Sequence, residues 1–386
     1  MDPLSLAGQS DPASMLAAEL PERPVWQAEP GVIHIVGYEA CRTALLDCER
    51  FSADASRYGP AGLGGSSAPA RTMNAADPPE HGALRSVVSD AFTRRAVAAH
   101  GPRLAALAEG LLDPLVDHGP FDVVQDFAAP YVQAALASVL GLSPGREEDL
   151  EQWSDELSAP TGRHGVELAR RQLGELFGEL VDRPDELPPG SLLSTLRAAL
   201  DTGELSREQV LATCVLLVQA GAETTRNMLA STVLTLIEQP ELIAALRSER
   251  HERDAVVEEA LRFHSSVAAA VRYTTGDTVL AGVPVSGRCP VFVWLGAANR
   301  DPAVVDHPER FDIGHPRHHL ALGAGPHLCL GAHLARAEVG AALAALAERV
   351  DSVTLAGPVT WLPSPLARGP RRAEIRCEPR RRSQRG

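Results

Sequence analysis

The sequence has no run of eighteen apolar residues, and its first residues, MDPLSLAGQ, contain neither a basic segment nor a hydrophobic one. A membrane-spanning helix needs about 20 mostly apolar residues, and a signal peptide needs both of the missing N-terminal features. We therefore expect no membrane anchor and no export. The six cysteines show no spacing typical of a disulfide framework, which favours reduced thiols and a cytoplasmic protein.

Lysine is absent, and 36 basic residues stand against 50 acidic ones, which gives a net charge of −14. A strongly negative charge argues against nucleic acid as the main partner. The stretch 371–385 is a local exception because it holds seven arginines. We interpret that stretch as a solvated terminus, since chain ends are commonly loosely ordered.

No Gly/Ser-rich or Pro-rich linker divides the 386 residues, although the length alone would suggest two or three domains. We predict one domain over 1–386, with loosely ordered ends at 1–20 and 378–386. The hydrophobic fraction of 45 % is ordinary for a globular protein. A chain of this length can also enclose a large buried cofactor.

Hydrophobic periodicity predicts a mainly helical fold with small β-sheets and no βαβ alternation. Helices are predicted at 38–47, repeatedly between 84 and 181, at 207–238 and at 256–263. Short β segments are predicted at 25–38, 278–293 and 353–377, and a long loop at 52–70. The helix 207–238 is the longest, and its apolar stretch 210–218 predicts burial on every side.

Cys329 lies in the segment 322–336, which reads LGAGPHLCLGAHLAR. Gly323 and Gly325 lack Cβ atoms, so the backbone can approach a planar ring closely. A helix is predicted to begin near Leu330, and its unpaired N–H groups and dipole favour a thiolate at Cys329. A thiolate in such a loop suits haem, where it pushes electron density onto iron and favours O–O cleavage.

Two other interpretations of Cys329 remain to be weighed. A lone cysteine in an apolar stretch is often a small buried hydrophobic residue. A zinc site is the second alternative, with candidate ligands His315, His318, His319, His327, Cys329 and His333. Structural zinc commonly uses a C-x₂₋₄-C pair, which this sequence lacks. The loop therefore favours haem over zinc.

A polar segment, AGAETT at 220–225, interrupts the apolar pattern in the middle of the long helix. Glycine, an acid and two hydroxyls are poor helix formers. A threonine can bond the carbonyl one turn back, which bends a helix and opens space for water.

On these two segments, the chain resembles the cytochrome P450 family. The haem loop of that family has the pattern F-G-x-G-x-H-x-C-x-G, and the long helix of the family carries A-G-x-[DE]-T-[TS]. One departure is Leu322, which stands where the family has an aromatic ring packed beside the ligand sulfur. Leucine keeps the apolar cover but loses the ring.

The resemblance implies haem b (iron protoporphyrin IX) buried between the long helix and the helix after Cys329, its axial thiolate ligand. Gly323, Gly331 and Ala220 would lie against the haem. Glu223 and Thr224 would hold water and relay the protons that O–O cleavage consumes. The Arg-Pro pair of fatty-acid peroxygenases is absent, which favours O₂ plus electrons as the oxidant.

Four basic residues match the family's partners of the haem carboxylates. The run DPPEHGALR at 77–85 resembles D-P-P-x-H-x-x-x-R, and it places His81 and Arg85 one helical turn apart. Arg272 and His327 are the other two. Arginine offers a planar fork that suits a carboxylate.

Glu259 and Arg262 share one face of a predicted helix. An isolated pair of this kind is usually an exposed ion pair that contributes little to stability. The segment 308–312 resembles the family's meander, however, and could add Arg310 to the pair. The resemblance therefore implies that the three residues support the haem loop and take no part in catalysis.

By resemblance, the substrate pocket is walled by loop 53–75, helices in 155–182, and residues near the turn 364–366. The individual pocket residues implied are Leu217, Val267, Ala268, Ala269 and Leu366. The small side chains of 267–270 leave space above the iron, which predicts a bulky substrate unless larger side chains elsewhere fill that space.

The implied function is a haem-thiolate monooxygenase that hydroxylates or epoxidises a natural-product-like molecule in secondary metabolism. No reductase segment is fused, so electrons would come from a ferredoxin and an NAD(P)H-dependent ferredoxin reductase. Oxidative aromatic coupling without oxygen insertion is one alternative. A thiolate-haem gas sensor is another, and the intact Glu223–Thr224 pair argues against it.

Overall fold

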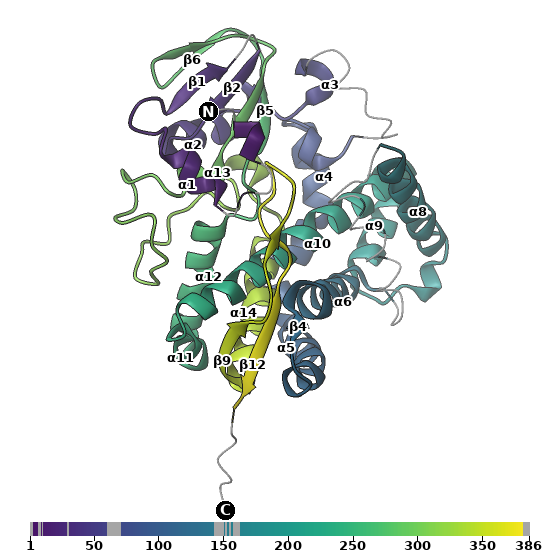
Figure 1. Ribbon diagram of the computed structural model, residues 1–386. Helices are drawn as coiled ribbons and strands as arrows, with labels where there is room; N and C mark the ends of the chain where they lie inside the picture. The colour runs from purple at the N-terminus through teal and green to yellow at the C-terminus, as the bar shows by residue number, and fades with distance from the viewer. Residues whose placement is uncertain are drawn as a thin grey trace, which may run out of the picture.

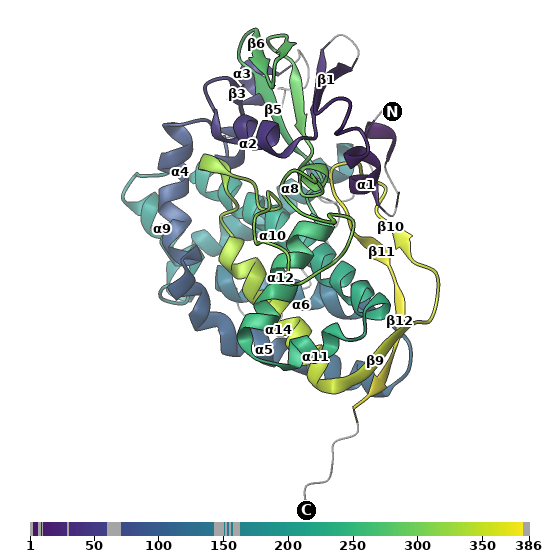
Figure 2. The same ribbon diagram turned by 90° about the vertical axis from the view of Figure 1, so that its left-hand side faces the viewer.

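The computed structural model describes residues 3–6, 9, 11–28, 31–59, 71–142, 150, 153, 156 and 163–380. Helices form the body of the molecule, and small sheets lie at its two ends (Figures 1 and 2). The sheet that contains β1 and β2 lies at one end in both views, and β9 and β12 lie at the other end. The predicted fold class, mainly helical with small sheets, is confirmed.

The described α-helices are α1 (Pro12–Ala17), α2 (Tyr38–Leu46), α3 (Ala55–Tyr58), α4 (Glu80–Ser89), α5 (Arg94–Asp117), α6 (Ala129–Leu140), α8 (Arg163–Val181), α9 (Leu192–Asp201), α10 (Arg207–Glu238), α11 (Leu242–Arg247), α12 (Arg250–His264), α13 (Leu295–Ala298) and α14 (Ala332–Arg349). Short helical turns are η1 (Pro3–Leu6), η2 (Met73–Ala75), η3 (Asp90–Phe92), η4 (Val123–Ala128), η5 (Pro184–Glu186) and η6 (Gly325–His327).

The described strands are β1 (Val25–Ala28), β2 (Val32–Ile35), β3 (Phe51–Ser52), β4 (Phe121–Asp122), β5 (Ala270–Thr274), β6 (Thr278–Leu280), β7 (Val283–Val285), β8 (Pro290–Val293), β9 (Val350–Leu355), β10 (Thr360–Trp361), β11 (Pro370–Arg372) and β12 (Glu374–Pro379). The largest sheet has the order β1-β2-β8-β5-β3, and only the β2–β8 pair in it is parallel. The strands β4-β12-β9 form a second sheet, and the pairs β6-β7 and β10-β11 complete the set. The three predicted β regions are thus all present.

Helix α10 crosses the whole molecule, and its ends follow directly from the sequence. Ser206 and Gln209 form a capping box in which each side chain bonds the other residue's backbone N–H, at 3.3 Å and 2.9 Å. That arrangement satisfies two of the donors that a helix start leaves unpaired. The helix ends at Glu238, with Gln239 as its C-terminal cap, because Pro240 cannot continue a helix.

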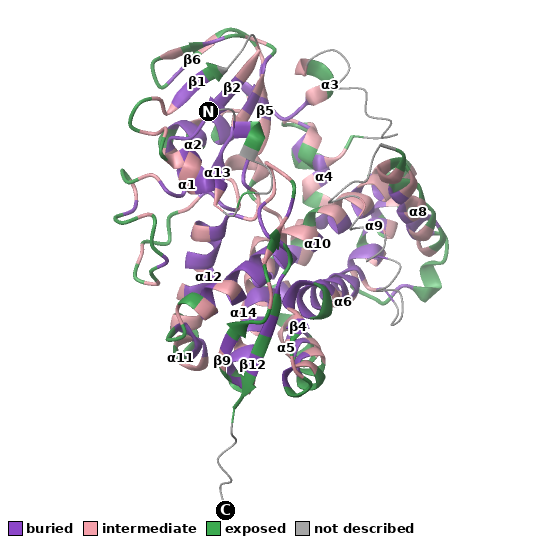
Figure 3. Cartoon of the chain, viewed as in Figure 1, coloured by how far each residue is buried: buried purple, intermediate pink, exposed green. Residues whose placement is uncertain are grey.

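Burial along α10 differs from the prediction. Leu211, Val215 and Leu216 in its first half are only half-buried, and Leu216 faces a cavity. The continuously buried stretch is 225–233, which includes Arg226 and Asn227. Figure 3 shows the buried residues concentrated where α10, α6 and α14 pack together. The apolar residues of 210–218 were predicted to be buried on every side, but some of them, such as Leu216, line a cavity instead.

Glu259 and Arg262 form a buried ion pair, with side chains 4 % and 1 % exposed. The Arg262 Nε and Nη2 atoms donate to the two Glu259 carboxylate oxygens at 2.8 Å and 2.6 Å. Arg262 also donates to the backbone carbonyls of Asn299, Pro308 and Arg310. The pair therefore joins α12 to the segment that precedes the Cys329 loop.

The predicted role of the Arg310 side chain is wrong. That side chain is 69 % exposed and lies near Glu309, while only its backbone carbonyl enters the network. Instead, Nδ1 of His315 lies 3.0 Å from Glu259 Oε1, and the backbone N–H of Asp312 donates to the same oxygen. The Arg310 side chain points into solvent, because Arg262 already donates to both carboxylate oxygens of Glu259.

Parts of the two chain ends are more ordered than predicted. Helix α1 buries Pro12, Ala13 and Leu16. Asp11, at its start, lies 3.8 Å from Arg300 and 3.7 Å from Arg368. Strand β12 continues to Pro379, whereas residues 381–386 lie outside the described part of the chain. In the predicted loop 52–70, the short helix α3 is present, and 60–70 are outside the described residues.

All six cysteines are free thiols. Two segments are long and apolar enough to cross a bilayer by length and composition, Val123–Leu140 and Gly325–Arg349. They are 72 % and 39 % buried in the fold. The core helix of a folded domain meets the same test, so this finding is weak evidence for a membrane span.

We expect Glu259→Gln to lower the free energy of unfolding by about 3–5 kcal/mol, because it leaves the Arg262 charge buried without a counterion. Denaturant unfolding measures this change. The matched control is Asp201→Asn, whose carboxylate lies 2.7 Å from Arg197 but is 55 % exposed. That change should have little effect on stability, because solvent screens an exposed ion pair. Equal losses in the two variants would contradict a supporting role for the buried pair.

Candidate functional site

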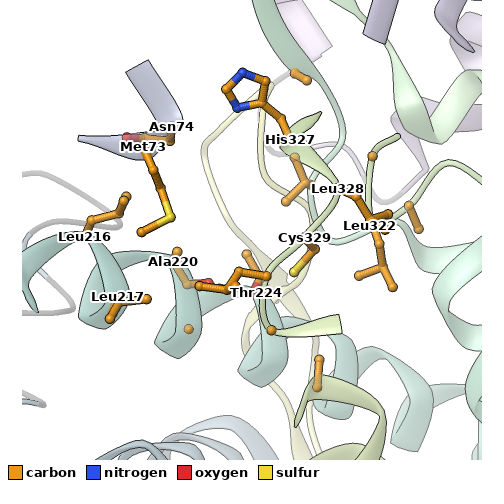
Figure 4. A pocket seen from close by; sticks show the side chains of 18 of the residues that line it. Met73, Asn74, Leu216, Leu217, Ala220, Thr224, Leu322, His327, Leu328 and Cys329 are labelled. Atoms are coloured by element: carbon orange, nitrogen blue, oxygen red, sulfur yellow. Dashed lines mark hydrogen bonds between the residues drawn. The ribbon is translucent and has the colours of Figure 1, made fainter. Parts of the chain in front are cut away.

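A cavity of about 640 Å³ lies between α10 and the loop that carries Cys329. Its described wall also includes parts of α4, β5 and α14. Figure 4 shows Cys329 on one side and Ala220 and Thr224 on α10 on the other, with His327 further along the loop. The structure thus brings together segments about a hundred residues apart in the sequence.

The Cys329 loop depends on two glycines with left-handed backbone conformations. Gly323 has a φ of +73° and Gly325 a φ of +69°, both costly for residues with a Cβ. A Cβ on Gly325 would also lie 2.8 Å from the Leu45 carbonyl oxygen. The loop then closes through the Cys329 N–H, which donates to the Leu322 carbonyl at 2.8 Å.

The thiol of Cys329 points into the cavity from just before α14. Burial raises its pKa, and the backbone N–H of Gly331 and the positive charges of Arg85 and Arg336 only partly oppose that effect. The helix start thus favours the thiolate, as expected, but in the protein alone burial has the larger effect on the pKa. Helix α14 begins at Ala332 with Gly331 as its cap, so desolvation outweighs the few donors nearby. A bound cation would supply the missing stabilisation.

Thr224 faces the cavity from α10. Its hydroxyl donates to the Ala220 carbonyl at 2.9 Å, which is the bond to the preceding turn that the sequence suggested. Ala220, Gly221, Thr224 and Thr225 all line the cavity. Glu223 does not line it and is half-buried on the adjacent face of the helix.

Four basic side chains gather on the cavity wall: His81, Arg85, Arg272 and His327. The two imidazole rings lie 4.3 Å apart between centroids. Burial, and then the positive charges of Arg272, His81 and Arg85, lower the pKa of His327 to about 3. Burial and Arg85 also lower the pKa of His81. The charged groups near His327 are therefore all positive, and none of those that affect its pKa is a carboxylate.

Two atoms of this group are buried without a hydrogen-bond partner, Nε2 of His327 and Nε of Arg272. Buried polar atoms are rarely left unpaired. Among the described residues that line the cavity, Glu338 on α14 is the only carboxylate. Unpaired donors and uncompensated positive charge at a cavity wall fit a flat cofactor that carries carboxylates and is held by Cys329, which describes haem.

The structure divides the predicted substrate residues into two groups. Leu217 and Val267 line the cavity, whereas Ala268, Ala269 and Leu366 do not, so the prediction is corrected for these three. Ala269 packs in a cluster with Trp26 and Trp294 instead, and Leu366 lies against the same cluster. The Ala268 N–H donates to the Leu366 carbonyl at 2.8 Å, which fixes both segments to each other.

The other predicted cofactor residues, Gly323, Gly331 and Ala220, all line the cavity. Within predicted loop 53–75, Met73 and Asn74 line it, while 60–70 lie outside the described residues. Of the predicted segment 155–182, residues 155 and 157–162 are outside the described chain, and no described side chain of α8 lines the cavity.

Sequence reasoning missed several lining residues, including Leu216, Phe92, Leu192 and Glu338. Leu216 carried a usable signal, since Leu216, Ala220 and Thr224 recur every four residues and share one helix face. Glu338 carried none, because a single acid in an alanine-rich helix resembles an exposed residue.

Comparison with known proteins gives a consistent result. The model of the Cytochrome P450 family matches residues 184–354. Cyclomarin C epoxidase CymV of Salinispora arenicola is 35 % identical over 349 residues, which cover 88 % of each chain. Pentalenic acid synthase of Streptomyces avermitilis is 35 % identical over 338 residues, covering 85 % of this chain and 83 % of that protein.

The fold agrees as well. The enzyme CxnD, which serves C–S bond formation in chuangxinmycin biosynthesis, superposes with a TM-score of 0.89 at 29 % identity, over 98 % of this chain and 97 % of that one. A mutant of P450 EryK in complex with erythromycin B gives a TM-score of 0.85 at 32 % identity, covering 98 % of this chain and 100 % of that one. The chain belongs to the cytochrome P450 family. It is a cytochrome P450 monooxygenase, and its family uses a haem-thiolate cofactor.

We expect Gly325→Ala to destabilise the protein more than Gly203→Ala does. The two glycines have nearly equal φ angles, +69° and +73°, so each change carries the left-handed cost of about 1–2 kcal/mol. Only Gly325 also faces a backbone oxygen at 2.8 Å, whereas nothing lies within 4 Å of the Gly203 position. Crowding should add about 1–3 kcal/mol. Equal losses on denaturant unfolding would show that the Leu45 contact does not constrain the loop.

Proposed function

We propose that the chain binds haem b through the Cys329 thiolate and hydroxylates or epoxidises a bulky, neutral natural product. One observation carries the proposal. A single cavity has a cysteine on one wall, a threonine hydroxyl on the facing helix, and four basic side chains without carboxylate partners on its wall. Haem with a thiolate ligand, when bound, activates O₂ and favours cleavage of its O–O bond.

The basic side chains would hold the two haem carboxylates. Arg85 and Arg272 offer planar donor forks, and the Nε2 atom of His327 is a buried donor or acceptor that lacks a partner. The Gly331 N–H already bonds the Cys329 sulfur, so it would moderate the charge on the ligand. Leu322 lies on the same wall and packs against the core, which keeps water from the sulfur.

Thr224 and Glu223 would relay protons into the cavity. The Thr224 hydroxyl lies at the cavity surface, and its bond to the Ala220 carbonyl fixes its rotamer. In that rotamer it can accept a proton from a water molecule and donate one into the cavity. Glu223 precedes it on the helix, outside the lining, and would supply protons from that side. A positioned relay of this kind contributes about 10²–10⁴-fold to a rate.

The wall suits a neutral, mainly apolar substrate. Apart from the basic group and Glu338, its polar side chains are few, among them Asn74, Thr224 and Thr225. Val267 and Ala270 are small and leave room above α10, while Ala268 and Ala269 contribute nothing to that room. The relatives named above act in natural-product biosynthesis, in agreement with a substrate from secondary metabolism.

Oxidative bond formation without oxygen insertion is a second candidate. It is favoured by the structural likeness to CxnD, an enzyme of C–S bond formation. The mass of the product separates the two candidates. Monooxygenation adds one oxygen atom, whereas bond formation removes two hydrogen atoms. Electrons in either case would come from a ferredoxin and its NAD(P)H-dependent reductase.

We expect Cys329→Ser to abolish the red-shifted Soret band that a thiolate ligand gives in the reduced, carbon monoxide-bound protein. Serine cannot replace the soft thiolate, so haem would bind weakly or with another ligand. The control is Cys289→Ser, whose thiol bonds the Gly287 carbonyl outside the cavity, and it should keep the band. Retention of the band in Cys329→Ser would refute the assigned ligand.

We expect Thr224→Val to lower the product formed per NADPH consumed, since O₂ reduction would then continue without proper proton delivery. Thr224→Ser should restore most of the yield, because it keeps the hydroxyl. The matched control is Thr232→Val. That threonine makes the same bond to the preceding turn, at 2.7 Å to Met228, but lies in the core. An equal loss of yield in both valine variants would assign the effect to the helix rather than to the proton relay.

A further inference from the structure

Two buried arginines, Arg300 and Arg368, lie outside the cavity lining and meet at the end of α12. Their side chains are 2 % and 8 % exposed. Arg300 donates to the Phe263 carbonyl at 3.1 Å. Arg368 donates to the same carbonyl at 3.4 Å and to the His264 carbonyl at 3.3 Å. The last carbonyls of a helix have no partner within it, so the two arginines together cap this end of α12.

Asp11, at the start of α1, is a counterion that the two arginines share. Its Oδ1 atom lies 3.8 Å from Arg300 and 3.7 Å from Arg368. The Ser14 hydroxyl donates to Asp11 Oδ2 at 2.6 Å and accepts from Arg300 at 3.1 Å. Burial raises the pKa of Asp11, but the arginine charges and the Ser14 bonds outweigh burial, so this pKa lies below its usual range. Two buried cations repel each other, and the shared carboxylate allows both to stay at one carbonyl.

The turn that follows α12 has a strained backbone. Ser265 has a φ of +44°, in the left-handed region that residues with a Cβ rarely adopt. Such a conformation costs free energy and persists only where the surrounding structure fixes it. The two arginines hold the carbonyls of the two residues before Ser265. The Arg368 N–H holds the residue after it, by donating to the Ser266 carbonyl at 2.8 Å.

This turn leads directly into the cavity wall. Ser266 and Val267, which follow Ser265, both line the cavity. Val267 forms an antiparallel bridge with Ala367, the residue before Arg368. The position of Arg368 therefore affects the position of Val267. A carboxylate of the N-terminal segment is thus linked, through a short series of contacts, to a side chain on the wall.

We propose that Asp11 is a positioning residue for the substrate cavity. Its carboxylate keeps Arg300 and Arg368 together at the end of α12, and Arg368 in turn holds Val267 in the wall. This proposal rests on the proposed function, because it concerns how tightly and in which orientation a bulky substrate is held. Without the carboxylate, repulsion between the guanidinium groups would move Arg368 away from α12, and the wall segment 266–268 would lose its fixed position.

The test is Asp11→Asn in the haem-loaded protein. Asparagine is as good a helix cap as aspartate, so α1 keeps its N-cap and only the charge is lost. The probes are clotrimazole, a bulky azole that would reach the wall, and imidazole, which is too small to do so. A shift of the Soret band reports the binding of each. Asp11→Asn should weaken clotrimazole binding about tenfold, as expected for a substitution that acts through a contact network, and leave imidazole binding unchanged.

Three further variants separate the charge from other effects. Asp11→Glu keeps the charge and should restore most of the clotrimazole affinity. Ser14→Ala removes the bridging hydroxyl but leaves the carboxylate, so the loss should be smaller than in Asp11→Asn. The matched control is Asp122→Asn, because Asp122 is also a capping aspartate but lies outside the cavity lining at the start of η4. This control should bind both azoles as the wild type does.

Hydrogen–deuterium exchange gives a second readout that does not use the haem spectrum. In Asp11→Asn, the Arg368 N–H, which donates to the Ser266 carbonyl, should exchange about tenfold faster than in the wild type. Asp122→Asn should leave this exchange rate unchanged.

The outcomes separate this proposal from the proposed function. Unchanged clotrimazole affinity in Asp11→Asn, or equal losses for clotrimazole and imidazole, would overturn the positioning role. Unchanged exchange at Arg368 would overturn it too. A wild-type protein without the thiolate Soret band would instead overturn the haem assignment, and the exchange rates would still decide whether Asp11 holds the wall. A tenfold loss confined to clotrimazole, together with faster exchange, supports the role.

Discussion

The structure depends on the buried pairing of Glu259 with Arg262, because this pair fixes how the Cys329 loop meets α10. Arg262 gathers the carbonyls of Asn299, Pro308 and Arg310 around one guanidinium group. The Asn299 side chain in turn accepts the N–H of Leu320, which directly precedes the cavity-lining loop. A buried charge that is satisfied on every side tolerates little movement. Helix α12 and the loop are thereby held as one unit.

The cavity between these elements combines two opposite electrostatic environments. Burial, and then the neighbouring positive charges, lower the pKa values of His81 and His327 in its basic group, and the carboxylates of a bound cofactor would offset those charges. The acid on α14, Glu338, shows the opposite shift, since burial raises its pKa to about 8. The basic side chains therefore suit the carboxylates of a bound cofactor, whereas Glu338 favours the protonated form.

The long helix α10 serves both environments. Its second half is buried among α6 and α14 and gives the fold a rigid axis. Its middle carries the Thr224 hydroxyl, whose bond to the preceding turn places it at the cavity surface. A chain that needed only stability would continue the apolar pattern through residues 220–225. The polar interruption is the local departure from helix-forming sequence that is common at functional sites.

The sequence by itself determined the elements whose signals are local. The capping box at Ser206 and the stop at Pro240 define α10, and the glycines around Cys329 define the loop, because caps and tight turns depend on a few adjacent residues. Only the tertiary structure decided which side chains face the cavity. It turned Ala269 toward the aromatic cluster, placed His315 rather than the Arg310 side chain at Glu259, and brought Glu338 to Thr225. Those outcomes depend on packing between distant segments, which spacing along the chain does not specify.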